Sequence, residues 1–182
     1  MIILASMYDS DANNSPHALP LAYLITFRCY GTWLHGDARG SMDPKHHVCG
    51  EAKVAASQAF ENSNRKQLKH APVILDARQR KVVETALRGV CDYRSYILRA
   101  LNGRTNHVHC VVSAMCKPEP ILDALKAYAT RALRRAGLIA LETKPWSRHG
   151  STIYLWTEKD AAKAIEYVMV GQDDELFRLD DH

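Results

Sequence analysis

The segment that most constrains the fold is residues 104–112 (RTNHVHCVV), which begins polar and continues into a run rich in β-branched residues. This pattern is typical of a strand that is buried over most of its length. Because side chains alternate between the two faces of a strand, His107 and His109 should project from the same face. Val108, Cys110 and Val112 should point the other way, into a core. The segment therefore predicts either a strand whose paired imidazoles chelate a divalent cation or a buried strand that merely carries two histidines.

The composition is that of an ordinary globular protein, since 47% of the 182 residues are hydrophobic and 24% are charged. We expect a flexible tail at 1–18 and a single domain at 19–182, with a long loop at about 31–71. The net charge of +4 is compatible with a polyanionic partner but does not require one. The five cysteines form no CxxC pair and no run reaches the length of a membrane span. These features favour a cytoplasmic protein with reduced thiols.

Hydrophobic periodicity predicts alternating strands and helices after the tail. The strands are expected at 21–30, 95–101, 106–113 and 151–156, and the helices after Asp76, at 118–136 and after Thr157. Asn102-Gly103 is a strong signal for a tight turn between the second and third strands. The first six elements match the ferredoxin-like β-α-β-β-α-β plan, with one more helix after it. We therefore predict an α+β fold, a ferredoxin-like antiparallel sheet with helices on one face plus a C-terminal helix.

A metal site around His107 and His109 would need further ligands and an open position. Zinc with cysteine ligands is not expected, because Cys110 faces away from the histidines and no other cysteine has suitable spacing. Hard ligands with an exchangeable position instead suggest Mg²⁺ or Mn²⁺, which polarise phosphoryl oxygens. The predicted helix at 118–136 is rich in basic residues, which favours contact with a polyanion or a solvated charged face.

The C-terminal helix offers a candidate nucleophile. On a wheel of about 100° per residue, its apolar residues cluster on one side and Tyr167 falls about 140° from their centre. Tyr128, in contrast, lies inside the apolar stripe of its own helix and is expected to pack in the core. A phenol has a pKa of about 10 and must be activated to attack, and a metal-bound phosphodiester is the complementary electrophile. The C-terminal helix would therefore carry the nucleophile, Tyr167.

Two segments of the chain carry a family resemblance. Residues 106–112 (NHVHCVV) resemble the His-hydrophobic-His signature of the HUH endonucleases, and residues 167–172 (YVMVGQ) resemble the tyrosine helix of their single-tyrosine transposases. This group includes the REP-associated tyrosine transposases. Residues 148–152 (RHGST) and 31–36 (GTWLHG) also look like stretches of transposases of this group. The resemblance extends from residue 19 to about residue 172.

The resemblance implies a metal-dependent transposase that cleaves and rejoins single-stranded DNA. Tyr167 would attack a scissile phosphate, which gives a 5′-phosphotyrosine intermediate and a free 3′-hydroxyl. His107 and His109 would hold the metal, with Gln172 as third ligand, although Gln172 follows the tyrosine by five residues rather than the usual four. The resemblance also implies recognition of a DNA hairpin and a homodimer. Phosphate contacts are expected from Arg104, Lys126, Arg131, Arg134, Lys144 and Arg148, a DNA contact from His149, and base stacking from Trp33 or Trp146.

Other functions are compatible with parts of the pattern. Histidine-triad nucleotide hydrolases also alternate histidine with hydrophobic residues, but they need a third histidine where this chain has Val111. Rolling-circle replication initiators share the His-hydrophobic-His strand. The alternative without catalysis is a decayed or domesticated transposase that still binds hairpin DNA or RNA.

Overall fold

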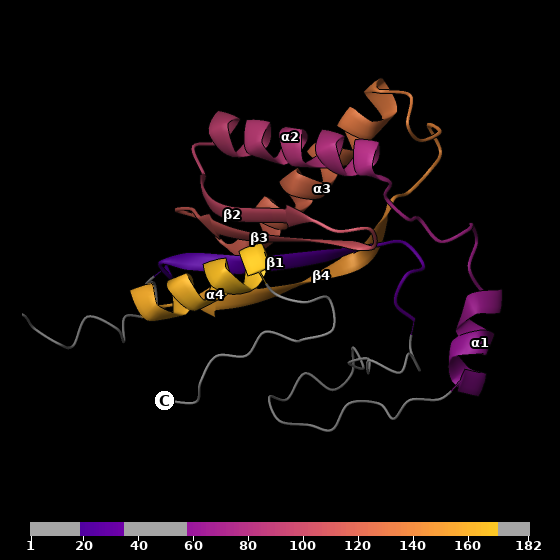
Figure 1. Cartoon of the computed structure of the whole chain (residues 1–182), viewed down its shortest axis with the longest axis horizontal. Coiled ribbons are helices and arrows are strands. Elements are labelled where there is room, and N and C mark those ends of the chain that lie inside the picture. Colours follow the sequence, from indigo (N-terminus) through magenta and orange to yellow (C-terminus); the bar gives the residue numbers. More distant parts are fainter. Residues whose placement is uncertain (1–18, 35–57, 171–182) are drawn as a thin grey trace, which may run out of the picture.

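The computed structural model describes residues 19–34 and 58–170, and its elements are labelled in Figure 1. In chain order they are β1 (Ala22–Cys29), α1 (Gln58–Lys66), α2 (Ala77–Tyr93), β2 (Ile97–Gly103), β3 (His107–Ser113), α3 (Pro118–Arg135), β4 (Trp146–Leu155) and α4 (Glu158–Val170). The predicted tail at 1–18 and part of the predicted long loop lie outside the described residues, and α1 falls within the range given to that loop. None of the described helices is both long and apolar enough to cross a lipid bilayer.

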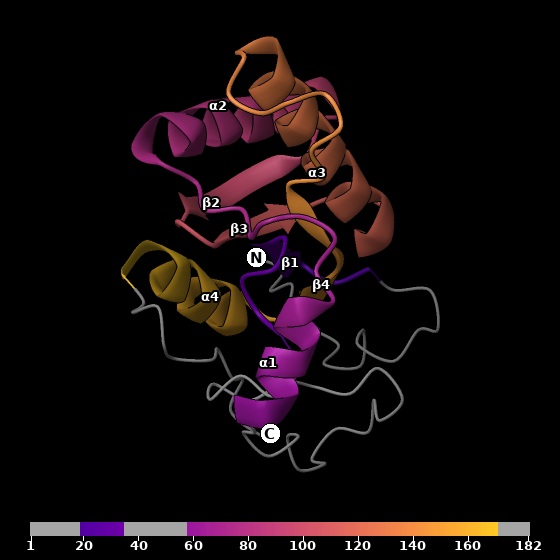
Figure 2. The same cartoon turned by 90° about the vertical axis from the view of Figure 1, so that its right-hand side faces the viewer.

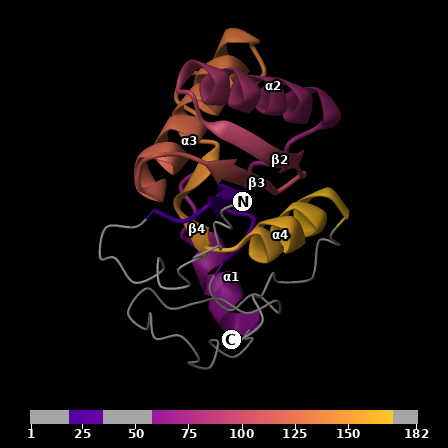
Figure 3. The same ribbon diagram turned by 90° about the vertical axis from the view of Figure 1, so that its left-hand side faces the viewer.

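The four strands form one antiparallel sheet in the order β2-β3-β1-β4. This order results when two β-α-β units interleave, as in the ferredoxin-like plan. Helices α2 and α3 cover one face of the sheet, and α4 lies against the opposite face (Figures 1, 2 and 3). The predicted α+β class and the ferredoxin-like sheet are therefore confirmed, and β1 and β3 are its central strands.

The larger part of the core lies between the sheet and helices α2 and α3. Alternate residues of the two central strands point into it and are completely buried. From β1 these are Tyr23, Ile25, Phe27 and Cys29, and from β3 they are Val108, Cys110 and Val112. The alternation of β3 therefore has the phase that the sequence predicts, with the valines and Cys110 in the main core.

Local signals mark the start of α2 and the end of α3. Asp76 Oδ1 accepts a hydrogen bond from the Gln79 N–H at 2.7 Å, and Gln79 Oε1 accepts one from the Asp76 N–H at 2.9 Å. This reciprocal capping box starts α2. Beyond α3, Gly137 adopts a φ of 65° and the Leu138 N–H donates to the Leu133 carbonyl at 3.0 Å. A left-handed residue closed by such a bond is the common end of a helix and suits glycine.

A smaller core lies on the other face of the sheet, under α4. Its buried members are Ala22, Leu24, Ala100, Val111 and Leu155 from the sheet and Ala164 and Val168 from α4. Most of these side chains are small, so the helix backbone can lie close to the strands. This second core holds the C-terminal helix on the face to which the histidines of β3 point.

The prediction of a tight turn at Asn102-Gly103 is wrong. Both residues belong to β2 and pair with β3, and the turn instead comprises residues 104–106. Tertiary contacts outweigh the local turn preference at these positions. The Asn102 Nδ2 donates to the Val168 carbonyl at 2.9 Å, and the Gly103 N–H donates to Glu84 Oε1 at 3.0 Å. A dipeptide that favours a turn in isolation therefore belongs to a strand here. Gly103 is small enough to lie against Glu84, and the Asn102 amide donates to α4.

The last strand begins earlier than the predicted 151–156, since β4 starts at Trp146. Its first part pairs with β1 across an irregularity, which removes the alternation that would have indicated a strand. The Lys126 ammonium of α3 stabilises the irregular segment. Its Nζ donates to the carbonyls of Ser147, Arg148 and His149 at 3.0, 3.3 and 3.1 Å.

The fold predicts opposite effects of alanine at two glycines. A Cβ at Gly150 of β4 would lie 2.8 Å from the Thr26 carbonyl oxygen and 2.9 Å from Leu122 Cδ2, whereas a Cβ at Gly89 of α2 would meet nothing within 4 Å. We expect Gly150→Ala to lower the free energy of unfolding by about 1–3 kcal/mol. Gly89→Ala should raise it by about 0.5–1 kcal/mol, because alanine favours the helix. Urea denaturation of both variants checks this, and equal stability of the two would contradict the close packing at Gly150.

Candidate functional site: a histidine pair beside a tyrosine

The two histidines of β3 lie side by side on the face of the sheet covered by α4. Their ring centroids are 4.3 Å apart and the rings are inclined at 75°. His107 is buried, with 8% of its surface exposed, and His109 is half-buried. The strand alternation predicted this shared face, and the rigid central strand holds the two imidazoles at a fixed separation.

Each imidazole has a hydrogen-bond partner at Nδ1. Asn106 Oδ1 lies 2.6 Å from His107 Nδ1, and Thr26 Oγ1 lies 2.7 Å from His109 Nδ1. Thr26 faces His109 directly across the β1–β3 ladder. Partners at one ring nitrogen orient an imidazole so that the other nitrogen, Nε2, can bind a cation. Asn106 lies in the turn before β3, so it has a place in the hairpin and also contacts a histidine.

Burial and nearby positive charge keep His109 neutral. The pKa of His109 is lowered to about 3, mainly by loss of solvation and further by His107, Arg104 and Arg28, which are positively charged or titrate to a positive form. A neutral imidazole is the form that binds a metal ion, so the burial of His109 preserves its capacity as a ligand over the usual pH range.

Tyr167 of α4 lies next to the histidine pair. Its ring centroid is 5.3 Å from that of His109, and the two rings are inclined at 73°. Tyr167 is half-buried and packs at the margin of the small core under α4. The helical wheel did not predict this packing, because the side that α4 buries includes Asp160 and not Met169, and is therefore turned toward Tyr167. The chain thus brings a phenol from its last helix to two imidazoles from its third strand.

Tyr128, the other tyrosine weighed as a nucleophile, lies on the opposite side of the sheet. It packs against the core under α2 and α3, 6.4 Å from the ring of Tyr93. The guanidinium of Arg131 lies 4.2 Å from its ring centroid. The sheet therefore separates Tyr128 from the histidines, as its position in an apolar stripe predicts.

The sequence did not single out Arg28, which the structure places beside the histidines. Arg28 of β1 pairs with His107 across the ladder, so its side chain is on the same face. Its guanidinium stacks on the ring of Trp33, 3.2 Å from the centroid. An arginine inside an otherwise apolar strand was the available signal, but only the register shows what it faces. Arg28 and Arg104 together make this side of the site positive, which suits a phosphate group.

The remaining charged or histidine side chains predicted to contact DNA are spread over α3, β4 and the segment between them. The Lys126 ammonium donates to three backbone carbonyls, and Arg134 Nη2 donates to the Thr143 carbonyl at 3.1 Å. The other four side chains are exposed: Arg131, Lys144, Arg148 and His149. Arg148 and His149 belong to the irregular segment of β4, on the side of β1 away from β3.

The third metal ligand predicted from the sequence, Gln172, lies outside the described residues. Within the described part of the chain, no group of three or more histidine, cysteine, aspartate or glutamate side chains is placed to hold a metal ion. The described donors are therefore His107 and His109, which would need oxygen ligands from elsewhere in the chain, from a nucleic acid or from water.

Comparisons with known proteins give structural matches only. No protein-family model matches the sequence, and no curated protein matches it. The chain is similar to a REP-associated tyrosine transposase whose structure was solved with a REP hairpin, at a TM-score of 0.48 and 12% identity over 91% of this chain and 72% of that one. It is also similar to a proposed transposase of Deinococcus radiodurans, at a TM-score of 0.47 and 12% identity over 86% of this chain and 95% of the other.

The low pKa of His109 predicts how stability depends on pH. Below about pH 6.5 the unfolded chain takes up a proton at this histidine, but the folded protein does not until about pH 3. As the pH is lowered from about 6.5 to about 3, the contribution of His109 to the free energy of unfolding should therefore decrease, by at most about 1.4 kcal/mol per pH unit. His109→Gln removes this dependence. Urea denaturation of both proteins from pH 7 to pH 4 checks it, and parallel curves would contradict a neutral, buried His109.

Proposed function

We propose that the protein is a metal-dependent single-stranded DNA endonuclease and strand transferase of the transposase type, with Tyr167 as nucleophile. The observation that carries this proposal is the placement of Tyr167 against the histidine pair, with ring centroids of His109 and Tyr167 5.3 Å apart. The sequence resemblance to single-tyrosine HUH transposases, on the His-Val-His strand and the tyrosine helix, supports the same function.

The residues around the histidines fit a divalent cation. Both Nδ1 atoms have oxygen partners, so Nε2 of His107 and Nε2 of His109 would be the ligand atoms. Gln172 is the proposed third ligand. A bound Mg²⁺ or Mn²⁺ would polarise the scissile phosphate and stabilise the charge that develops on its oxygens.

In the proposed reaction, the Tyr167 hydroxyl oxygen attacks the phosphorus of a DNA phosphodiester. The bond from phosphorus to the 3′-oxygen breaks, and a 5′-phosphotyrosine bond forms. The phenol loses its proton to solvent, and the departing 3′-oxygen gains one, so that a free 3′-hydroxyl results. Arg28 and Arg104 provide positive charge next to the reacting phosphate. Attack of a 3′-hydroxyl on the phosphotyrosine reverses the step and rejoins DNA without another energy source.

The DNA substrate is proposed to carry a hairpin, as the sequence resemblance implies. Exposed Lys144, Arg148 and His149 are the proposed contacts to its backbone, since positively charged side chains position a nucleic acid through its phosphates. A homodimer remains a prediction from the resemblance.

The first test is whether Tyr167 forms a covalent bond to DNA. The protein is incubated with a pool of single-stranded oligonucleotides that contain hairpins and are labelled at the 3′ end, with Mn²⁺ or Mg²⁺, and the products are separated on a denaturing gel. We expect a labelled protein adduct that Tyr167→Phe abolishes and chelation of the metal prevents. Tyr128→Phe is the matched control, because Tyr128 lies on the opposite face of the sheet, and it should retain the adduct.

Two outcomes would contradict the proposal. An adduct that persists in Tyr167→Phe but disappears in Tyr128→Phe would overturn the choice of nucleophile. Specific binding of a hairpin from the pool, without any adduct in either metal, would favour the alternative of a hairpin-binding protein without catalysis.

The hydrogen bond between His109 Nδ1 and Thr26 Oγ1 gives a second test, of the metal site. Thr26→Val keeps the shape of the side chain but removes the oxygen that lies 2.7 Å from His109 Nδ1. We expect Mn²⁺ to bind about 10- to 100-fold more weakly, because such partners orient a ligand imidazole. Thr85→Val is the control, because Thr85 lies at an exposed position of α2 on the other side of the sheet. Titration calorimetry with Mn²⁺ measures the affinity, and equal affinities of the two variants would contradict a metal at His109.

A further inference from the structure

Helix α4 rests on the sheet mainly through small apolar side chains. The contacts involve Ala164 and Val168 of the helix and Leu24, Ala100 and Val111 of the strands. Apolar contact is not directional, and small side chains offer little interlocking to resist rotation or sliding. A slip of one residue would turn the helix by about 100° and carry Tyr167 away from the histidines. The position of Tyr167 therefore requires a directional contact as well.

Asn102 of β2 provides such a contact at the end of α4. Val168 lies in the last described turn of α4, which the structure describes up to Val170. The Asn102 Nδ2 donates a hydrogen bond to the Val168 carbonyl at 2.9 Å. The acceptor belongs to the residue next to Tyr167, so this bond restrains the backbone that carries the phenol.

The same asparagine is tied to the histidine strand. Asn102 is paired with His109 across the β2–β3 ladder, and the ring of His109 lies 5.3 Å from that of Tyr167. We propose that Asn102 is a positioning residue for Tyr167, because its hydrogen bond to Val168 fixes the last turn of α4 relative to the histidine pair. The proposal rests on the function proposed above, in which Tyr167 acts beside these histidines.

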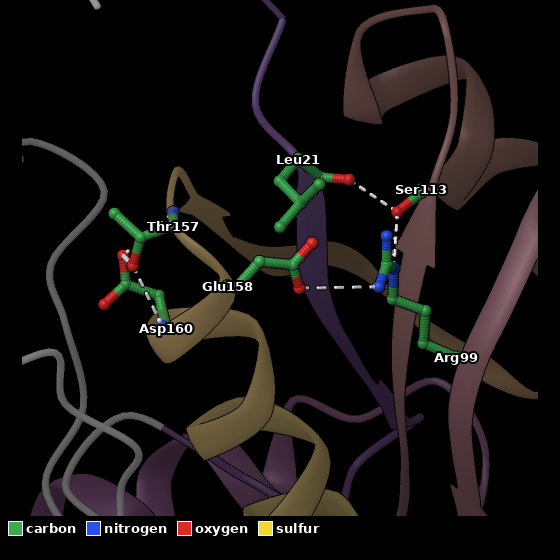
Figure 4. Close-up of polar contacts among 6 residues, drawn as sticks. All are labelled: Leu21, Arg99, Ser113, Thr157, Glu158 and Asp160. Atoms are coloured by element: carbon green, nitrogen blue, oxygen red, sulfur yellow. Dashed lines mark hydrogen bonds and ion pairs between the residues drawn. The ribbon is translucent and has the colours of Figure 1, made fainter. Parts of the chain in front are cut away.

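The other end of α4 is held less firmly. Figure 4 shows Arg99 of β2, which donates to Ser113 Oγ at 2.8 Å and reaches Glu158 of α4 at 4.0 Å. The Glu158 side chain is 80% exposed, so this ion pair contributes little. Thr157 and Asp160 hydrogen-bond to each other. These bonds cap the start of α4 and do not tie the helix to the sheet. The half-buried bond from Asn102 is therefore the stronger polar restraint on where α4 lies.

The test in the active protein uses Asn102→Ala and the nearly isosteric Asn102→Leu, both of which remove the donor. We expect kcat for adduct formation to fall about 10- to 100-fold with KM changed less than threefold, since misplacement by about 1 Å costs this much. Gln79→Ala is the matched control, because it removes a similar amide-to-carbonyl bond, from Gln79 Nε2 to the Leu138 carbonyl at 3.0 Å, on the other side of the sheet. It should lower stability but leave kcat unchanged.

A spectroscopic measurement tests the position of Tyr167 without DNA or metal. The protein is labelled with 3-fluorotyrosine, and the ¹⁹F resonance of position 167 is identified by its loss in Tyr167→Phe. We expect this resonance to shift or broaden in both Asn102 variants and to stay unchanged in Gln79→Ala. Thermal unfolding confirms that each variant is folded, and the leucine variant preserves the packing if alanine does not.

The outcomes separate this inference from the proposed function. An unchanged fluorine resonance in folded Asn102 variants overturns the positioning role, whatever the activity. An altered resonance with undiminished kcat, while Tyr167→Phe is inactive, also overturns it. If Tyr167→Phe still forms the adduct, the proposed nucleophile is wrong, and the fluorine spectra alone then decide whether Asn102 positions Tyr167.

Discussion

The constraint on which the rest of the structure depends is the two-residue alternation of β3 in the centre of a sheet that is covered on both faces. Val108, Cys110 and Val112 fill the main core under α2 and α3, and the histidines point to α4. A shift of one residue would exchange the two sets and bury both imidazoles among apolar side chains. The packing of the larger core therefore also determines where the histidines lie.

Placing polar rings under a helix has a cost that the structure offsets locally. A buried polar group destabilises a fold unless it is hydrogen-bonded, and both imidazoles have an oxygen partner at Nδ1. Burial also disfavours the charged imidazolium, with Arg28 and Arg104 acting in the same direction on His109. The same arrangement that makes the site tolerable for the fold keeps His109 neutral and able to bind a cation. Structural and chemical requirements coincide at this residue.

The second core, under α4, shows why a helix of small residues needs polar restraints. Alanine and valine allow the helix to approach the strands closely, which brings Tyr167 to the histidines, but they define its rotation poorly. The bond from Asn102 to the Val168 carbonyl supplies direction at the end that carries the tyrosine. The dipeptide that favours a turn in isolation thus stays in β2, where its amide reaches the helix.

The sequence by itself determined the features that depend on local signals: the order of the four strands and of helices α2, α3 and α4, the shared face of His107 and His109, and the start of α2 after Asp76. The helical wheel favoured Tyr167 over Tyr128 as the candidate nucleophile, but both tyrosines pack at the margin of a core, and only the fold places them on opposite faces of the sheet. Only the tertiary structure decided which residues meet across elements. Strand register places Arg28 opposite His107 and Asn102 opposite His109, and the irregular pairing at the start of β4 hides the first part of that strand from any periodic pattern. Periodicity defines the direction of a side chain relative to its own element, whereas its neighbours depend on pairings between distant segments that no local pattern contains.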